Sequence, residues 1–226
     1  MNITAIIPAA GMGKRFGGDV KKQFFEVLGH TVLYYTLTAL NRAYPFKEFI
    51  LGADPDDFYF LYSQLSMADI KNYQLVQGGG ERYETVYNCL KAVTTDYVLI
   101  HDAVRPFVTE DIVRNVADAA KDTGAAICGL PVRDTLKKIS GSFVEKTVSR
   151  DEYVLSHTPQ IFKTSLLKKA VENADERGIV ITDEAQAMEL FGVRVKWAMS
   201  LSDNIKITFL NDMDMAEGLV RKYFGQ

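Results

Sequence analysis

Four basic residues follow the first apolar run of the chain, in a loop that is otherwise rich in small residues. The run ends at Pro8 and leads into Ala9-Ala10-Gly11-Met12-Gly13. The bases that follow, against the single acid Asp19, are Lys14, Arg15, Lys21 and Lys22. Small residues let the backbone approach a ligand closely, and the free N–H groups at the start of a helix attract anions. The loop therefore predicts a phosphate site.

Two familiar phosphate-binding loops fit this segment poorly. A dinucleotide-binding loop needs a third glycine where Phe16 stands, and an acidic residue for the ribose is not clear. A Walker loop needs Ser or Thr after Gly-Lys, but Arg15 stands there, and Pro8 occupies the place of the first glycine. A strand-to-helix turn with incidental surface lysines is the plainer alternative.

Three further segments combine glycines, hydroxyls and charges. They are Gly78-Gly79-Gly80-Glu81-Arg82-Tyr83-Glu84-Thr85-Val86, His101-Asp102-Ala103-Val104-Arg105-Pro106 and Asp203-Asn204-Ile205-Lys206-Ile207-Thr208. With the first loop, they resemble the 2-C-methyl-D-erythritol 4-phosphate cytidylyltransferases of the non-mevalonate isoprenoid pathway, along nearly the whole chain. The resemblance implies a Rossmann-like nucleotidyltransferase that joins CTP and a sugar-alcohol phosphate into a CDP-alcohol, releasing pyrophosphate with Mg²⁺ as cofactor.

The residues suit the chemistry of that reaction. A phosphate monoester is already ionised near neutral pH, since its second pKa is about 6. No side chain has to remove a proton from it, so the histidines at positions 30, 101 and 157 need not be catalytic. The difficulty is to bring a triphosphate and a monophosphate together, which demands cations and rigid positioning.

The resemblance implies roles for individual residues. Arg15 and Lys22 would stabilise the charge on the α-phosphate and the departing pyrophosphate. Arg150 and Lys206 would hold the phosphate of the second substrate, with Arg150 reaching in from another subunit. The residues implied around CTP are Ala9, Ala10, Gly11, Gly13, Gly79, Gly80, Arg82 and Thr85. Those implied around the alcohol phosphate are Asp102, Arg105, Thr135 and Thr182. The candidate ligands for Mg²⁺ are Asp102 and Asp203.

Three of these residues also have a plainer structural explanation. An arginine at the end of a hairpin, such as Arg150, is usually solvated. A lysine in an alternating strand, such as Lys206, often simply faces water. Asp102 is also placed to cap the turn before Pro106, which is compatible with either of its proposed roles.

The chain departs from the family pattern at three positions. The family usually has Pro-Lys-Gln where this chain has Lys21-Lys22-Gln23, so the fixed φ of proline is absent and Lys21 competes with Lys22 for the catalytic role. A carboxylate is common where Gly80 stands, and a serine where Thr85 stands. The first change loses a side-chain contact, and the second keeps the hydroxyl and adds a methyl group.

Other functions share part of this pattern. Ribitol-5-phosphate cytidylyltransferases look similar through the glycine segment and through His101 to Phe107, whereas Asp134-Thr135 and the segment from Thr182 to Ala185 favour the methylerythritol substrate. A sugar-1-phosphate nucleotidyltransferase would have a similar first loop without the later motifs. A non-enzymatic nucleotide-sensing module would bind CTP without needing Arg150 and Lys206 together.

Composition limits the partners and the compartment. The 226 residues contain 47% apolar side chains and no apolar run long enough for a membrane span. A net charge of −3 gives no general attraction to nucleic acid. The two cysteines, Cys89 and Cys128, lie in apolar stretches and are predicted to be buried free thiols. The start of the chain shows no leader pattern, so the cytoplasm is the expected compartment.

Short apolar runs alternate with segments of helical period, which predicts an α/β fold with a Rossmann-like, mostly parallel sheet covered by helices on both faces. We expect one nucleotidyltransferase domain over residues 1–226. The predicted strands are Ile3 to Pro8, Glu48 to Ala53, Tyr73 to Gln77, Tyr97 to His101 and Ala125 to Leu130. Thr31 to Tyr44 predicts a helix, and Thr109 is expected to cap another that stops before Gly124.

A protruding β-hairpin is predicted after the fifth strand, around the turn Ser140-Gly141-Ser142. Its apolar positions have no evident cover within an α/β core: Val132, Leu136, Ile139, Phe143, Val144 and Val148. We therefore expect a dimerisation arm at about 131–157 and a homodimer in which the partner subunit covers it. The alternative is a hairpin that folds back on its own domain.

Overall fold

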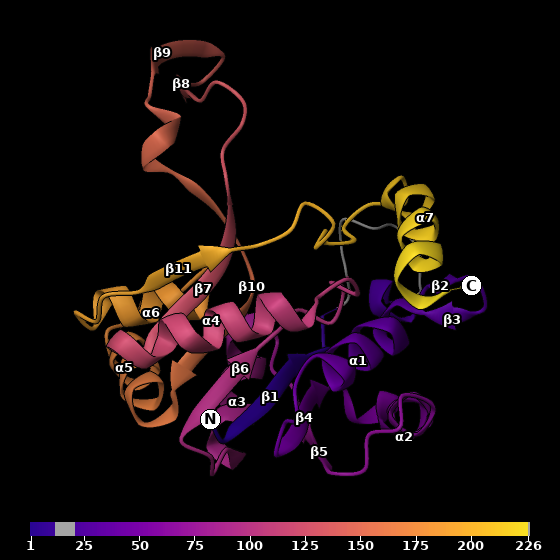
Figure 1. Ribbon diagram of the computed structural model, residues 1–226. Coiled ribbons are helices and arrows are strands. Elements are labelled where there is room, and N and C mark those ends of the chain that lie inside the picture. The colour runs from indigo at the N-terminus through magenta and orange to yellow at the C-terminus, as the bar shows by residue number, and fades with distance from the viewer. Residues whose placement is uncertain (12–20, 226) are drawn as a thin grey trace.

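A seven-stranded sheet forms the centre of the computed structural model, which describes residues 1–11 and 21–225 (Figure 1). Its strands are β1 (Ile3–Pro8), β4 (Glu48–Ala53), β5 (Tyr73–Gln77), β6 (Tyr97–Ile100), β7 (Ala125–Pro131), β10 (Val154–Lys163) and β11 (Lys196–Met199). The strand order is β11-β7-β10-β6-β1-β4-β5. Only β10 runs antiparallel to its neighbours, β6 and β7. The predicted mostly parallel sheet is confirmed.

Alternating side chains of the central strands build two cores. Ile3, Ala5 and Ile7 of β1 point to one face, and Ile6 points to the other. The helices over the first face are α1 (Val32–Ala43), α2 (Phe58–Met67) and α4 (Glu110–Thr123). Those over the second are α3 (Arg82–Ala92), α5 (Thr164–Glu176) and α6 (Glu184–Leu190). Both faces of the sheet are therefore covered, as the sequence predicts.

The predicted helix ends agree with the capping residues. Thr31 accepts a hydrogen bond from the backbone N–H of Tyr34, and Thr109 accepts one from that of Ile112. Gly124 ends α4 with a φ of 79°, a left-handed conformation that favours glycine. Because Thr31 and Tyr44 are caps, α1 is one residue shorter at each end than the predicted segment.

A third apolar cluster lies beside the sheet, under the C-terminal helix α7 (Asp212–Phe224). It joins α7 to the short strand β2 (Glu26–Val27), to α1 and to Phe107 in the loop after β6. β2 pairs with a second short strand, β3 (His30–Thr31). Two short 3-10 helices flank the same end of the sheet: η1 (Lys22–Phe24) and η2 (Pro55–Asp57).

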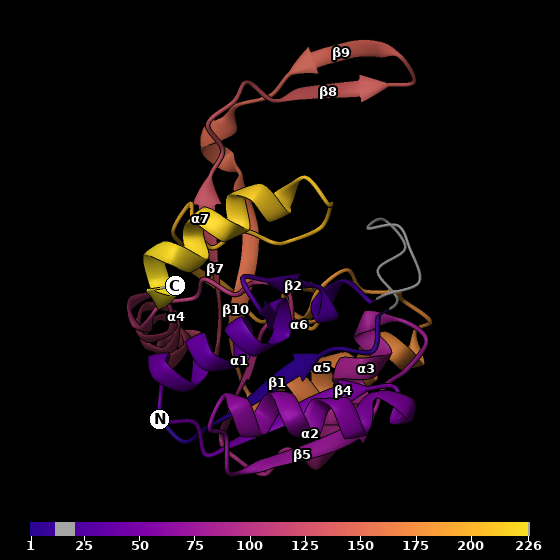
Figure 2. The same cartoon turned by 90° about the vertical axis from the view of Figure 1, so that its right-hand side faces the viewer.

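The hairpin arm projects from the body of the molecule (Figure 2). It contains β8 (Lys137–Ser140), β9 (Phe143–Thr147) and the 3-10 helix η3 (Arg150–Glu152). Val154 still pairs with Pro131 in the main sheet, so the projecting part spans residues 132–153. Ile139, Phe143 and Val144 are 65%, 78% and 63% exposed, and the hairpin does not fold back on its own domain. Cover by a partner subunit stays a prediction.

Two further predictions concern the whole chain. Cys89 and Cys128 are buried and unbridged, as predicted, and burial raises the pKa of both thiols to about 12. Among the described residues, 1–11 and 21–225, no helix combines the length and the apolar character needed to cross a lipid bilayer.

Candidate active site

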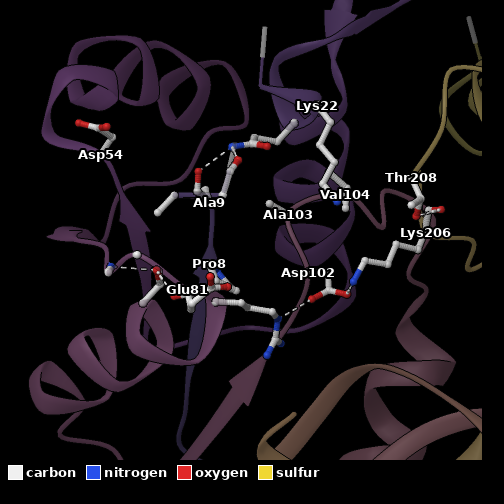
Figure 3. Close-up of a pocket in the computed structure, with 17 residues that line it drawn as sticks. Pro8, Ala9, Lys22, Asp54, Glu81, Asp102, Ala103, Val104, Lys206 and Thr208 are labelled. Carbon is white, nitrogen blue, oxygen red and sulfur yellow. Dashed lines mark hydrogen bonds and ion pairs between the residues drawn. The ribbon is translucent and has the colours of Figure 1, made fainter. Parts of the chain in front are cut away.

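A pocket of about 530 Å³ lies beyond the carboxyl ends of the central parallel strands (Figure 3). Its described walls come from the segments that follow β1, β4, β5 and β6 and from the loop between β11 and α7. The residues are Pro8, Ala9, Ala10, Gly11, Lys22, Gln23, Asp54, Gly79, Gly80, Glu81, Arg82, Thr85, Asp102, Ala103, Val104, Lys206 and Thr208. Most of the residues that the sequence places around CTP therefore share one cavity.

Close backbone packing forms the wall after β5. A Cβ atom on Gly78 would lie 2.4 Å from the Cβ of Ala10, and one on Gly79 would lie 2.3 Å from that of Glu84. Only glycine fits at these two positions without a backbone shift. The backbone N–H of Gly79 donates a hydrogen bond to Oγ1 of Thr85, 3.0 Å away. The wall next to Ala10 is thus held in place by α3.

Thr85 accommodates the methyl group by which it differs from the family pattern. Its Cγ2 lies 2.5 Å from where a Cβ of Gly52 would be, so the methyl group occupies space that a glycine in β4 leaves open. Its Oγ1 remains bonded to Gly79. The hydroxyl function therefore survives this departure. At Gly80, a Cβ would lie 3.4 Å from Oε2 of Glu84, so the third glycine is less tightly enclosed.

A carboxylate surrounded by cations lies after β6. Oδ2 of Asp102 is 2.8 Å from Nζ of Lys206 and 3.5 Å from Nε of Arg105, and Oδ1 is 3.1 Å from Nε of Arg82. Burial alone would raise the pKa of Asp102, but Arg82, Lys206 and Arg105 together hold it well below its usual range. Asp102 is therefore ionised at any ordinary pH and orients the surrounding cations (Figure 3).

Glu184, at the start of α6, holds the other side of Arg82. Both of its carboxylate oxygens accept from Nη1 of Arg82, at 2.8 and 3.0 Å, and its side chain is 1% exposed. Burial raises the pKa of Glu184, and Arg82 opposes that shift. Sequence reasoning did not assign Glu184 to the site, although it lies in the segment Thr182 to Ala185 that favoured the methylerythritol substrate.

The structure separates the two lysines that competed for the catalytic role. Lys22 lines the pocket, whereas Nζ of Lys21 lies 2.5 Å from Oδ2 of Asp57 in η2. Gln23 is a second site residue that the sequence analysis did not assign. Its Nε2 donates to the carbonyl oxygens of Ala9, at 2.6 Å, and Gly11, at 3.2 Å. Gln23 therefore ties η1 to the loop after β1.

Buried polar residues behind the pocket wall hold the backbone of Asp102 in place. Its backbone N–H donates to Oγ1 of Thr158 in β10, and Nδ2 of Asn204 donates to the Thr158 carbonyl. Nη1 of Arg105 donates to the Asn204 carbonyl at 2.8 Å. Arg105 thus lies behind the pocket wall and not among the lining residues. Its predicted contact with the alcohol phosphate stays a prediction.

His101 belongs to the same group of buried polar residues. Its Nε2 donates to the Arg105 carbonyl at 2.9 Å, and its side chain is fully buried. Burial lowers the pKa of His101 to about 4, so the imidazole is neutral at physiological pH. In this form His101 has a structural contact, to the Arg105 carbonyl.

Thr135, Arg150 and Thr182 are not among the residues that line the pocket of their own chain. Thr135 and Arg150 are exposed on the arm, and Nη1 of Arg150 donates to the Arg133 carbonyl. Thr182 is exposed and bonded to Gln186. Gly13 and Arg15 fall outside the described residues.

The predicted metal ligands do not form a suitable site for Mg²⁺ in this chain. Asp102 already has three cationic neighbours, so a divalent cation at its oxygens would be repelled. Oδ2 of Asp203 accepts from Nζ of Lys222, at 2.6 Å, and from the hydroxyl of Tyr223, at 2.9 Å. Among the residues that the structure describes, no group of three or more His, Cys, Asp or Glu side chains is placed to hold a metal ion.

Comparison with known proteins gives a consistent result. The family model for 2-C-methyl-D-erythritol 4-phosphate cytidylyltransferase matches residues 3–222. The enzyme of that name from Bacillus cereus is 37% identical over 96% of this chain and 97% of its own length. The one from Acinetobacter baumannii is 39% identical over 94% of this chain and 91% of its own length.

Solved structures agree with the sequence comparison. The 4-diphosphocytidyl-2C-methyl-D-erythritol synthase of Anaerococcus prevotii superposes with a TM-score of 0.85 at 32% identity, over 97% of this chain and 98% of the other. The 2-C-methyl-D-erythritol 4-phosphate cytidylyltransferase of Thermus thermophilus gives 0.80 at 31% identity, over 98% and 100%. The fold and the cationic pocket are those of an α/β nucleotidyltransferase. The chain belongs to the 2-C-methyl-D-erythritol 4-phosphate cytidylyltransferase family.

Proposed function

We propose that this chain transfers the cytidylyl group of CTP to 2-C-methyl-D-erythritol 4-phosphate. The products are 4-diphosphocytidyl-2-C-methyl-D-erythritol and pyrophosphate, and the reaction belongs to isoprenoid precursor biosynthesis. The observation that carries the proposal is the pocket at the carboxyl ends of the strands, in which Lys22, Arg82 and Lys206 meet a glycine-walled cleft. Membership of the family supports the choice of substrates.

The reaction needs positioned charge more than proton transfer. An oxygen of the ionised monoester attacks the α-phosphorus of CTP, and the bond from that phosphorus to the pyrophosphate oxygen breaks. Lys22 lies on the side of the pocket formed by the loop after β1, and with Arg15 it stabilises the charge on the leaving pyrophosphate. Lys206, held by Asp102, lies across the pocket and binds the attacking monoester.

The glycine wall supports selection of a pyrimidine. Backbone groups around Ala10 and Gly79 are fixed by the close contacts described above, so their donors and acceptors are rigid. If these groups match cytosine, a base with a different hydrogen-bonding edge leaves them unpaired. Each buried group left unpaired costs that base about 1–3 kcal/mol of binding free energy. A purine is excluded by size.

Mg²⁺ and the homodimer complete the proposal. Mg²⁺ would be held by the phosphate oxygens of the nucleotide and by water, ligands that it prefers, and would supply neutralisation of the triphosphate charge. The arm carries Arg150 and Thr135 away from the pocket of its own chain, which supports their use by a partner subunit. The cytoplasm stays a prediction.

The test is a pyrophosphate-release assay with CTP, UTP, ATP and GTP, each with 2-C-methyl-D-erythritol 4-phosphate or ribitol 5-phosphate. We expect turnover with CTP and the methylerythritol substrate to exceed every other pair by about 100-fold or more in kcat/KM. Preference for ribitol 5-phosphate would favour the alternative cytidylyltransferase. Comparable turnover of UTP or ATP would indicate a sugar nucleotidyltransferase, and CTP binding without turnover would indicate a sensing module.

A further inference from the structure

Lys21 forms a partly buried ion pair next to the pocket without lining it. Its Nζ is 2.5 Å from Oδ2 of Asp57 and 3.7 Å from Oδ2 of Asp54, and the side chains of Lys21 and Asp57 are only 12% and 18% exposed. An ion pair with so little solvent contact is screened less than one on the surface. It connects η1 to η2, which follows β4.

Lys22 lies between three attachments of η1 to the body of the protein. On one side is the ion pair of Lys21 with Asp57. On the other side, Gln23 is bonded to the loop after β1, and the ring of Phe24 packs on Phe60 of α2 with centroids 4.8 Å apart. The backbone N–H of Phe24 also donates to the Lys21 carbonyl. The orientation of Lys22 therefore depends on where its neighbours are fixed.

We propose that Lys21 is a positioning residue for Lys22. The ion pair with Asp57 holds Lys21, the N-cap residue of η1, at φ −62° and ψ 130°. The side chain of Lys22, the next residue, is thereby directed to the pocket. That φ is close to the value to which a proline ring is locked, about −65°. The ion pair thus restricts the φ of residue 21 through a side-chain contact, whereas a proline would restrict it through its ring.

This inference rests on the proposed function, because it needs Lys22 to bind the phosphates of the nucleotide. It predicts that loss of either partner of the ion pair has the same effect. Lys21→Met and Asp57→Asn should each lower kcat about tenfold, which is less than the roughly 100-fold that a 1 Å misplacement at a reacting centre can produce. Lys21→Pro should restore kcat to within about threefold of wild type.

The two single variants separate positioning from simple charge. If Lys21 acted only by its electric field, Lys21→Met would weaken anion binding and Asp57→Asn would strengthen it. If Lys21 acts by positioning Lys22, both variants bind anions more weakly and have a lower kcat. A double variant supplies the second criterion: in a Lys22→Ala background, Lys21→Met should lower kcat no further, because its effect passes through Lys22. Lys71→Met, which removes an exposed lysine paired with Asp69, is the matched control.

Binding of inorganic pyrophosphate, measured by calorimetry, keeps the inference separate from the proposed function. We expect wild type to bind pyrophosphate, and Lys21→Met and Asp57→Asn to bind it about tenfold more weakly with little change in melting temperature. A wild type that binds pyrophosphate without turning over CTP would overturn the proposed function alone. Three results would each overturn the role of Lys21. The first is an affinity for pyrophosphate that falls in one single variant and rises in the other. The others are a kcat that Lys21→Pro does not restore and pyrophosphate affinities equal to that of wild type.

Discussion

The guanidinium of Arg82 is held by both carboxylate oxygens of Glu184, a residue that follows it by 102 positions in the chain and is almost completely buried. Arg82 also contacts Asp102, so two acids from different parts of the sequence fix one cation at the rim of the pocket. Three cations and two carboxylates pack together there. The pocket wall after β6 is therefore an ionic structure, whose members depend on one another.

Glu184→Leu should lower the free energy of unfolding by about 3 kcal/mol, because it leaves the Arg82 charge without its bidentate partner in a partly buried setting. Urea denaturation measures the change. Glu189→Leu, at an exposed position of the same helix, should change stability by no more than about 0.5 kcal/mol. The double variant Arg82→Met/Glu184→Leu should recover part of the loss, and a double variant that is fully additive would contradict the pairing.

Lys22→Ala should lower kcat by about 10²–10³, the scale for losing one preorganised donor to the charge of the transition state, with a smaller change in KM. Steady-state pyrophosphate release measures both constants. Lys21→Ala should be mild by comparison. Near-normal turnover of Lys22→Ala, together with a severe defect in Lys21→Ala, would mean that the assignment of the two lysines is reversed.

Arg150→Ala and Lys206→Ala should each be nearly inactive, yet a mixture of the two should recover activity if the proposed dimer forms and exchanges subunits. Each mixed dimer has one site that lacks both groups and one site that lacks neither. Random exchange puts half the protein in mixed dimers, so recovery should reach about a quarter of wild type. Demonstrated exchange without any recovery would show that Arg150 does not act across an interface.

Stability should fall as the pH is lowered from about 6.5 to about 4, and His101 should be one cause. Its pKa is lowered to about 4 in the folded protein, against 6.5 in the unfolded chain. Within that window the unfolded chain binds the proton and the folded protein does not, so the unfolded state gains. The loss is on the order of 3 kcal/mol for a group this buried.

His101→Gln keeps a donor for the Arg105 carbonyl and does not titrate. Urea denaturation at pH 7 and pH 5 should therefore show a smaller pH dependence for this variant than for wild type. His157, whose pKa burial also lowers to about 4, provides a second variant for the same comparison. An unchanged pH dependence in both variants would contradict the assignment of the titrating groups.

The sequence predicted the first three strands of the central sheet to the residue. β1 and β4 are mostly buried apolar runs, and both have the predicted bounds, as does the edge strand β5. Two later strands were harder to predict. β10 is interrupted by the polar run Ser156-His157-Thr158 and by Pro159 near its register shift. β11 is a four-residue edge strand with Trp197 half exposed. Neither segment shows the pattern of a buried strand.

The site divides in the same way. Ala10, Gly79 and Lys22 stand in loops directly after strands or in a recognisable motif, and the structure brings them together. Glu184 and Gln23 contact segments that are distant in the sequence, Arg82 and the loop after β1. A local sequence pattern does not predict such contacts. The role of Arg150 cannot be read from the structure of one chain, because its proposed site belongs to another copy of the chain.

The arm has both of its roots in the central sheet, in the neighbouring strands β7 and β10. β7 leads out to it and β10 leads back, and β10 carries Thr158, which holds the backbone of Asp102. Substitutions at the root of the arm and substitutions at its tip should therefore have different effects. At the root, a shift of register would displace the wall of the pocket that carries Asp102, so we expect substitutions there to lower activity. At the tip, the constraint comes from the proposed dimer instead, because Ile139, Phe143 and Val144 beside Gly141 are the positions that a partner subunit would cover. A change there would leave the pocket of the same chain intact and would act on the site of the partner.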